Sequence, residues 1–279
     1  MSRSNVPTVT LTDNHHAGPL HHAGSYERRV HASLERIWEN VFDWEHLAHL
    51  HDGSFADCSL VEQGRWGWCV DLTPCGAEPQ RIQLLADRAT GRYTSTTIDG
   101  AGVGTEIRVM LDEIEPHLVD ITVEFHLPGP RTDRSEYLGS AYADFYATLW
   151  DEDEAMMQAR ERALAAPTQA DRSVEPIDLG DACDVRANLP LAFQLGGMAF
   201  QLVEHNGDLI AHSAVCPHWL GPLQGPLENG KIRCPWHGFV FDIVTRRCEL
   251  HSTLRLPMPP LIRIVEGRVV AAFSHAEGD

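Results

Sequence analysis

Apolar and polar positions alternate along much of residues 55–127, with the period of two that predicts β-strands. Turn-forming residues at Gly64, Gly91 and Pro116 separate the alternating runs. The run Gly100–Gly104 leads into a strand rather than a helix, so it predicts a hairpin and not a dinucleotide-binding loop. We expect a short strand at 26–31, followed by strands at 55–61, 65–72, 81–87, 92–97, 106–114 and 119–127.

Helical spacing is found in two segments. Ser33 can cap a helix with apolar residues on one face, and we expect this helix to continue to a stop at Gly53. A long helix is expected at 135–164, where the apolar positions suit packing across a curved sheet. The predicted organisation is an arm at 1–24 that is flexible, an α+β domain at 25–165, a linker at 166–175 and an all-β domain at 176–275.

The first domain has a characteristic order of predicted elements: one strand, helical segments, a run of antiparallel strands and a long closing helix. This order resembles the helix-grip (START/SRPBCC) fold. The resemblance implies an antiparallel sheet that wraps the last helix and leaves an apolar cavity between them.

Charge and composition narrow the function classes. The chain has 279 residues and a formal net charge of −18, which argues against nucleic acid or an anionic membrane surface as a partner. No apolar run approaches membrane-spanning length, and the first residues lack the apolar core of a signal peptide. We therefore expect a cytoplasmic protein. The seven cysteines do not suggest a disulfide scaffold, and five are expected to be reduced: Cys58, Cys69, Cys75, Cys183 and Cys248.

Two short segments each offer one thiol and one imidazole. The first is Cys216–His218, and Cys234–His237 begins after fifteen intervening residues, so the pattern is C-x-H-x15-C-x2-H. A [2Fe–2S] cluster with two Cys ligands on one iron and two His ligands on the other is the Rieske arrangement. Zinc is the alternative, but structural zinc motifs usually pair like ligands, so mixed pairs favour the cluster. Residues 175–275 resemble Rieske proteins of the lower-potential oxygenase or ferredoxin type.

A second motif, E-N-x-x-D-x-x-H-x4-H, runs from Glu39 to His51. It resembles the opening of the catalytic domain of Rieske non-haem iron oxygenases. The resemblance implies that His46 and His51 bind a mononuclear iron(II) and that Asp43 bridges electron transfer between subunits. The family's third ligand is a carboxylate on the last helix, which implies Asp153, although the surrounding run departs from the family pattern at positions 158 and 160. Two His and one carboxylate form the facial triad of such oxygenases.

The sequence pattern alone does not decide whether His49 or His51 is the second histidine ligand of the iron. On a continuous helix His46 and His49 share a face and His51 does not, so periodicity alone favours His49. A break in the helix would favour His51. Asp153 stands in the acidic run 151–154, and such a run is usually a solvated helix face.

These features predict a Rieske-type mono- or dioxygenase that uses O2 to hydroxylate a small hydrophobic substrate in the helix-grip cavity. Trp66, Trp68 and Phe145 are candidate contacts for that substrate. No nucleotide-binding loop is found, so electrons must come from a separate NAD(P)H-dependent reductase, a ferredoxin or both. The family usually places its Rieske domain first, and here the order is reversed. A homo-oligomer is expected, with a trimer favoured.

The alternative is a fusion without mononuclear iron. In it, a helix-grip module binds a hydrophobic ligand or performs a cyclase-like reaction, and the Rieske domain transfers electrons. This hypothesis explains the short first domain and the reversed order of the two domains without requiring His46, His51 and Asp153 to lie together.

Overall fold

The computed structural model describes residues 19–274, which divide into two units. The N-terminal unit contains the chain up to Trp44 together with Gly53–Trp150. The C-terminal unit contains Glu45–Asp52 together with the chain from Asp151 onward. Helix α3 (Asp133–Leu164) contributes its first part to one unit and its second part to the other. The short segment Glu45–Asp52 therefore belongs with residues that begin 99 positions after its end.

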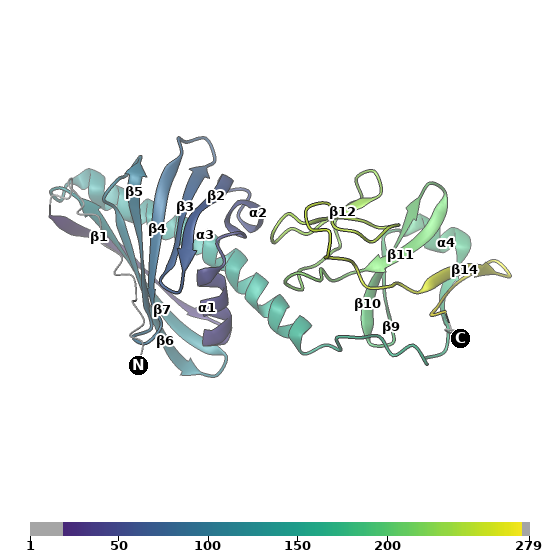
Figure 1. Cartoon of the computed structure of the whole chain (residues 1–279). Coiled ribbons are helices and arrows are strands. Elements are labelled where there is room, and N and C mark those ends of the chain that lie inside the picture. Colours follow the sequence, from purple (N-terminus) through teal and green to yellow (C-terminus); the bar gives the residue numbers. More distant parts are fainter. Residues whose placement is uncertain (1–18, 275–279) are drawn as a thin grey trace, which may run out of the picture. The chain divides into compact units, whose positions relative to one another are not determined.

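A seven-stranded antiparallel sheet forms the N-terminal unit, in the order β1-β7-β6-β5-β4-β3-β2 (Figure 1). The predicted strands from residue 55 onward and the hairpin at Gly100 are confirmed, and the order of elements is that of the predicted helix-grip fold. The strands are β1 (Leu20–Val30), β2 (Phe55–Gly64), β3 (Gly67–Pro74), β4 (Gln80–Asp87), β5 (Arg92–Gly100), β6 (Glu106–Glu115) and β7 (Leu118–Pro128).

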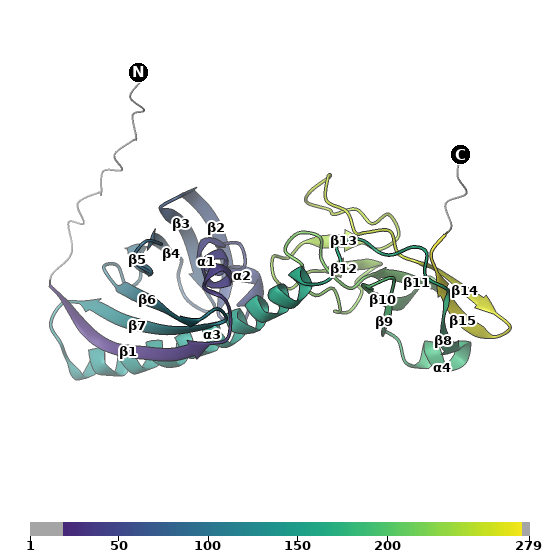
Figure 2. The same cartoon turned by 90° about the horizontal axis from the view of Figure 1, so that it is seen from below.

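The first part of α3 packs on the inner face of this sheet, and Figure 2 shows β1 and β7 running alongside it. Every second residue of β7 is buried, as the alternating pattern predicts. The ring of Phe125 stacks on Tyr142 at 5.4 Å and meets Tyr146 edge-on at 5.3 Å. A Cβ at Gly139 would lie 2.2 Å from the carbonyl oxygen of Ala23, so only glycine lets the helix approach β1 this closely.

Strand β1 shows that the predicted arm at 1–24 extends too far. The strand begins at Leu20, so residues 20–24 are not an arm, while residues 1–18 lie outside the described part of the chain. Leu20 pairs with Pro128 in the ladder between β1 and β7. The polar composition of this segment concealed the strand, because ladder hydrogen bonds come from the backbone and do not require apolar side chains.

Helix α1 (Leu34–Phe42) is capped by Ser33, whose side chain accepts a hydrogen bond from the backbone of Arg36. The predicted continuation to Gly53 is wrong, because α1 ends at Phe42 and a separate helix α2 (Leu47–Leu50) follows. The indole Nε1 of Trp68 donates to the carbonyl of Val41 at 2.8 Å. A continuing helix would need that carbonyl for its own hydrogen bond, so the contact from β3 supports the break.

The C-terminal unit beyond α3 contains three small antiparallel sheets and one short helix that the sequence did not predict, α4 (Ala182–Ala187). Asp181 caps this helix. The sheets are β11-β10-β9, β12-β13 and β14-β15-β8. Their strands are β8 (Ile177–Asp181), β9 (Leu191–Leu195), β10 (Met198–His205), β11 (Asp208–Ser213), β12 (Lys231–Arg233), β13 (Val240–Asp242), β14 (Leu261–Val265) and β15 (Arg268–Ala272).

The stretch predicted as a linker, residues 166–175, has no helix or strand. Its Ala170 and Val174 pack against a buried cluster that includes Phe200 and Phe273. None of the seven cysteines, all within residues 19–274, forms a disulfide. Within the same residues no helix is both long and apolar enough to cross a membrane.

Candidate metal centres

Two loops of the same backbone design carry the predicted cluster ligands. In each loop the residue four positions after the cysteine donates its N–H to the cysteine carbonyl: Leu220 to Cys216 and Gly238 to Cys234, both at 3.0 Å. Both of these residues have positive φ, 65° at Leu220 and 67° at Gly238. A positive φ is strained for leucine, so contacts elsewhere in the unit must hold the first loop in this shape.

The four predicted ligands converge between the loops. Cys216 and Cys234 are 0% and 1% exposed. The rings of His218 and His237 meet edge-on with centroids 4.8 Å apart, and His218 is the more exposed of the two. The thiols therefore lie in the core, and His218 lies nearer the solvent. The apolar cluster around the thiols includes Leu223, Ile232, Trp236, Phe241 and Leu256.

The two thiols form a coupled pair. A hydrogen bond with Cys234 and then burial raise the pKa of Cys216. The same hydrogen bond lowers the pKa of Cys234 despite its burial, and the backbone N–H groups of Trp236 and His237 act in the same direction. Backbone N–H groups directed at sulfur are also a means by which proteins tune iron–sulfur clusters.

Gly221 lets the first loop approach the second. A Cβ at this position would lie 2.9 Å from the sulfur of Cys234 and 2.8 Å from the ring of Trp236. Two thiols and two imidazoles held together in this way fit the ligand set of a Rieske cluster.

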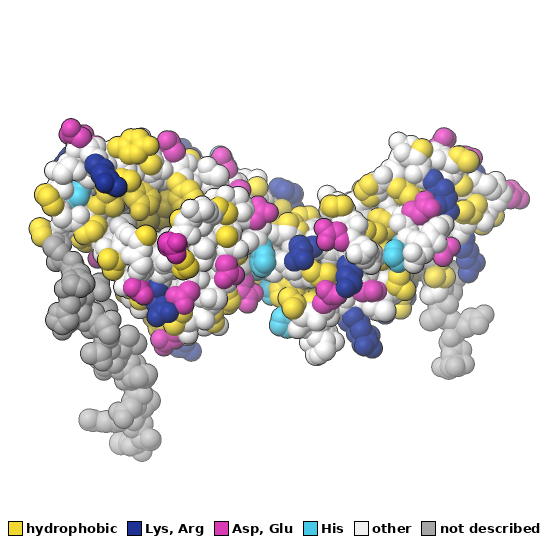
Figure 3. All heavy atoms as spheres, turned by 90° about the horizontal axis from the view of Figure 1, so that it is seen from above, with side chains coloured by type: hydrophobic (Ala, Val, Ile, Leu, Met, Phe, Trp, Pro, Cys, Tyr) yellow, Lys and Arg dark blue, Asp and Glu magenta, His cyan; other side chains and the backbone are white. Residues whose placement is uncertain are grey.

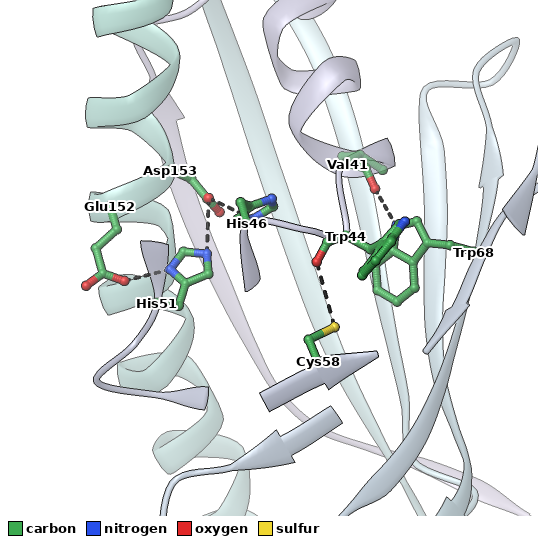
Figure 4. A network of polar contacts seen from close by, with 8 residues as sticks. All are labelled: Val41, Trp44, His46, His51, Cys58, Trp68, Glu152 and Asp153. Atoms are coloured by element: carbon green, nitrogen blue, oxygen red, sulfur yellow. Dashed lines mark hydrogen bonds and ion pairs between the residues drawn. The ribbon is translucent and has the colours of Figure 1, made fainter. Parts of the chain in front are cut away.

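A second group of ligating side chains lies elsewhere in the C-terminal unit (Figure 4). Nε2 of His51 lies 3.2 Å from Oδ1 of Asp153, and Nε2 of His46 lies 3.4 Å from the same oxygen. The three candidate ligand atoms are within 4.8 Å of one another. His46, His51 and Asp153 are 3%, 1% and 8% exposed, so the group is buried. We call these three residues the triad.

The break between α1 and α2 explains how both histidines reach Asp153. His46 is the N-cap of α2, and His51 is its C-cap with φ −99° and ψ 41°, outside the helix. Their rings meet edge-on at 5.1 Å. The structure therefore brings His51 to Asp153. The periodicity argument for His49 fails because its premise, a continuous helix, is wrong.

Glu152 contacts the triad, although the acidic run 151–154 predicts a solvated face for it. Its Oε2 lies 2.6 Å from Nδ1 of His51. Because a carboxylate can only accept, Nδ1 of His51 carries the proton, and Nε2 is directed at Asp153. Partners of this kind orient histidine ligands in metal sites. The available signal was its position next to Asp153, since neighbouring helix residues lie only about 100° apart.

The charge of Asp153 suits a cation. Burial alone would raise its pKa, but hydrogen bonds with His46 and His51 outweigh burial and hold the pKa well below its usual range. A neutral His51 that donates to Glu152 would turn a lone pair toward the Asp153 carboxylate. The arrangement therefore needs positive charge, either a second proton on the imidazole or a metal ion. The donor set fits iron(II).

Asp43, the predicted electron bridge, belongs to the N-terminal unit. It is buried at the end of α1, where its backbone N–H donates to the carbonyls of Glu39 and Asn40 at 3.1 Å. Its role in electron transfer stays a prediction.

Comparison with known families identifies the domain that contains the two loops. Residues 175–259 match the model of the Rieske [2Fe–2S] domain. These residues are a Rieske domain. Among curated proteins, Apoptosis-inducing factor 3 from mouse and from human is each 45% identical over 57 residues, which is 20% of this chain and 9% of each relative. The match thus covers only a small part of those relatives.

Two solved structures are each similar to a portion of this chain. The ferredoxin of carbazole 1,9a-dioxygenase from Nocardioides aromaticivorans IC177 matches at 21% identity and a TM-score of 0.32, over 36% of this chain and 100% of that one. The Zhui aromatase/cyclase from Streptomyces sp. R1128 matches at 12% identity and a TM-score of 0.44, over 52% of this chain and 98% of that one.

Proposed function

We propose that this chain is a Rieske non-haem iron oxygenase that hydroxylates a small hydrophobic molecule with O2. The observation that carries the proposal is the buried meeting of His46, His51 and Asp153 in the same chain as a Rieske domain. Two imidazoles and one carboxylate are the ligand set of non-haem iron(II) oxygenases. In the proposed site these three residues hold the iron.

The chain's own residues have separate tasks in this proposal. Cys216, His218, Cys234 and His237 hold the cluster, which supplies single electrons, and the triad holds an iron(II), which supplies the dioxygen chemistry. Glu152 keeps the proton of His51 on Nδ1. Burial keeps bulk water from the Asp153 carboxylate. The electrons come from a separate NAD(P)H-dependent reductase, a ferredoxin or both.

The proposed substrate class has support in the N-terminal unit. Figure 3 shows apolar side chains gathered in a hollow on one face of this unit. Phe145 packs edge-on against Phe55 at 5.8 Å and remains a candidate contact. Trp68 is less suited to this role, because it is buried and its indole N–H is committed to Val41. An apolar hollow of this kind favours a hydrophobic substrate.

The proposal carries over further predictions from the sequence. These are a cytoplasmic location and a homo-oligomer, with a trimer favoured.

A second function is favoured by one feature of the triad. The imidazoles of His46 and His51 both contact Asp153 directly, so protonated imidazoles could satisfy the buried carboxylate without a metal. In that case the chain would join a ligand-binding or cyclase-like module to a Rieske electron carrier. Metal content separates the two functions.

The test of the oxygenase is incorporation of labelled oxygen. Protein purified without oxygen and loaded with ferrous iron would receive electrons from a chemical reductant and 18O2, with naphthalene and indole as hydrophobic probes. The expected result is labelled product from the wild type and from Asp144→Ala, a change at an exposed carboxylate on α3. Asp153→Ala should give none while keeping the cluster spectrum. Equal labelling by Asp153→Ala would remove this residue from the site.

A further inference from the structure

His49 lies in α2, between the two candidate iron ligands that cap this helix, but it faces the Rieske domain. A Cβ added to Gly238 would lie 2.5 Å from Cε1 and 2.7 Å from Nε2 of His49, so the imidazole packs directly on the backbone of Gly238. Gly238 follows the cluster ligand His237 in the chain. The next residue of α2, Leu50, packs on the buried apolar side chains that surround Cys216 and Cys234. The short helix thus contacts both centres.

The second part of α3 makes a similar connection to the other cluster loop. Arg160 follows Asp153 by seven positions, about two helical turns, and so lies on the same face of the helix. Its guanidinium lies 4.2 Å from the ring centroid of Trp219, and its Nη1 donates to the Trp219 carbonyl at 3.0 Å. The Trp219 ring in turn lies 5.5 Å from that of His237. Stacking of this kind favours a fixed position for the loop.

Both elements that carry the triad therefore touch the cluster loops of their own chain. We infer that electrons pass from the Rieske cluster to the triad within one chain, through the contact of His49 with Gly238. This inference rests on the proposed function, because it requires iron at the triad. It differs from the route between subunits that the resemblance implies for Asp43.

The length of the path supports this route. Helix α2 has four residues and is therefore about 6 Å long, so His49 lies within one turn of both His46 and His51. On the other side its ring rests on the residue bonded to His237. In the transfer the reduced cluster would give up one electron and return to two ferric irons, and an iron that the triad holds in the ferric state would accept this electron and become ferrous. No bond is broken. Arg160 is a positioning residue that holds the first loop against α3.

A cavity beside the contact allows His49 to be changed. It has a volume of about 540 Å³ and is lined by α2 and the second cluster loop, including His49, Arg233 and Cys234. A phenylalanine at position 49 therefore has room to replace the imidazole while keeping an aromatic ring against Gly238. His251 provides a matched control, because its ring lies 5.1 Å from that of Phe239 in the same loop but it is not part of α2.

Magnetic coupling tests the route without any turnover. The full chain would be loaded at the triad with Co2+, which is paramagnetic, or with Zn2+, which is not, and the cluster would be reduced with dithionite. We expect Co2+ to raise the microwave power needed to saturate the cluster signal. The Co2+ chains would then be diluted into an excess of a Cys234→Ala/Asp153→Ala chain. Coupling within one chain survives this dilution, and loss of coupling in proportion to dilution would overturn the inference.

The rate of electron transfer from the cluster tests the role of His49. Iron-loaded protein with ferric iron at the triad would be mixed with less than one equivalent of dithionite, which reduces the cluster. Stopped flow would then follow the recovery of the cluster absorbance, which reports reoxidation of the cluster. His49→Ala should slow the recovery about tenfold, which corresponds to about 1.4 kcal/mol in the barrier. His49→Phe should fall between, and His251→Ala should match the wild type. Recovery in His49→Ala at the rate of the wild type, with equal iron content, would remove His49 from the route.

The two proposals fail differently. If the wild type binds no more Co2+ or iron than Asp153→Ala, both the oxygenase and the route are wrong. If the wild type binds the metal but coupling is lost on dilution, only the route within one chain is wrong.

Discussion

The two candidate metal centres are built in opposite ways. The predicted cluster ligands come from two compact loops with the same hydrogen-bonding pattern, and both loops belong to a single domain. The triad comes from the two residues that cap a four-residue helix and from a long helix far away in the sequence. The ligands of the cluster site can therefore be recognised from their spacing in the sequence, whereas the residues of the triad come together only when the chain has folded.

The supports of the two centres differ accordingly. In the loops, backbone N–H groups act on both thiols, in addition to the hydrogen bond between the thiols themselves. In the triad, the orientation of His51 depends on one carboxylate, Glu152. We expect changes at the loops to destroy the cluster outright, whereas changes around the triad should be graded.

The largest effect is expected from His237→Ala. Without this imidazole the cluster loses one of its four ligands, and we expect acid-labile sulfide and the Rieske EPR signal to disappear. His251→Ala, a change at a neighbouring histidine, should keep both. A normal signal from His237→Ala would overturn the assignment of this ligand.

Asp153→Ala should affect only the second centre. Removing the one carboxylate of the triad should lower the iron content from about three to about two per two sulfides, with an unchanged cluster spectrum. Iron and sulfide analysis measures this, with Asp144→Ala as the control on the same helix. Loss of sulfide together with iron would show that the two centres are not independent.

A smaller effect is expected from Glu152→Gln. Without the carboxylate the proton on Nδ1 of His51 is less firmly held, and metal affinity at the triad should fall by about 10- to 100-fold. Competition with a metal chelator measures the affinity. Glu136→Gln, which changes an exposed carboxylate of α3, should leave the affinity unchanged. Equal affinities for the Glu152 variant and the wild type would assign Glu152 to the surface after all.

The smallest effect concerns pH and the Rieske domain. Burial lowers the pKa of His212 from 6.5, although its Nδ1–H donates to the Ser213 carbonyl, an effect that acts in the opposite direction. The unfolded chain then binds the proton more readily than the folded chain. The contribution of His212 to stability is complete above pH 6.5 and is lost as the pH falls below it. Denaturant titrations should show this slope in the wild type and a weaker slope in His212→Gln. Identical slopes would contradict it.

The sequence predicted the sheet well because alternation is a local signal with one face buried, as β7 shows along its whole length. It predicted the cluster loops for a similar reason, since their ligands are close in the chain. It could not predict the end of α1, because the hydrogen bond from Trp68 to Val41 links residues 27 positions apart. That missed break is what left His49 and His51 undecided.

Two other features were beyond local reasoning. Strand β1 has a polar start, and its pairing with the distant β7 is what makes Leu20–Gly24 a strand. From the sequence, Glu152 is predicted to belong to a solvated acidic run, and only the folded structure shows its contact with His51. Both cases depend on contacts between segments about a hundred residues apart, which no pattern of a single segment contains.

The most direct test of the central claim is iron and acid-labile sulfide per chain, measured on protein purified without oxygen and then supplied with ferrous iron. A Rieske cluster together with an occupied triad predicts about three iron per two sulfide. A ratio of about two to two that persists after ferrous iron is added would contradict the oxygenase and favour the fused electron carrier.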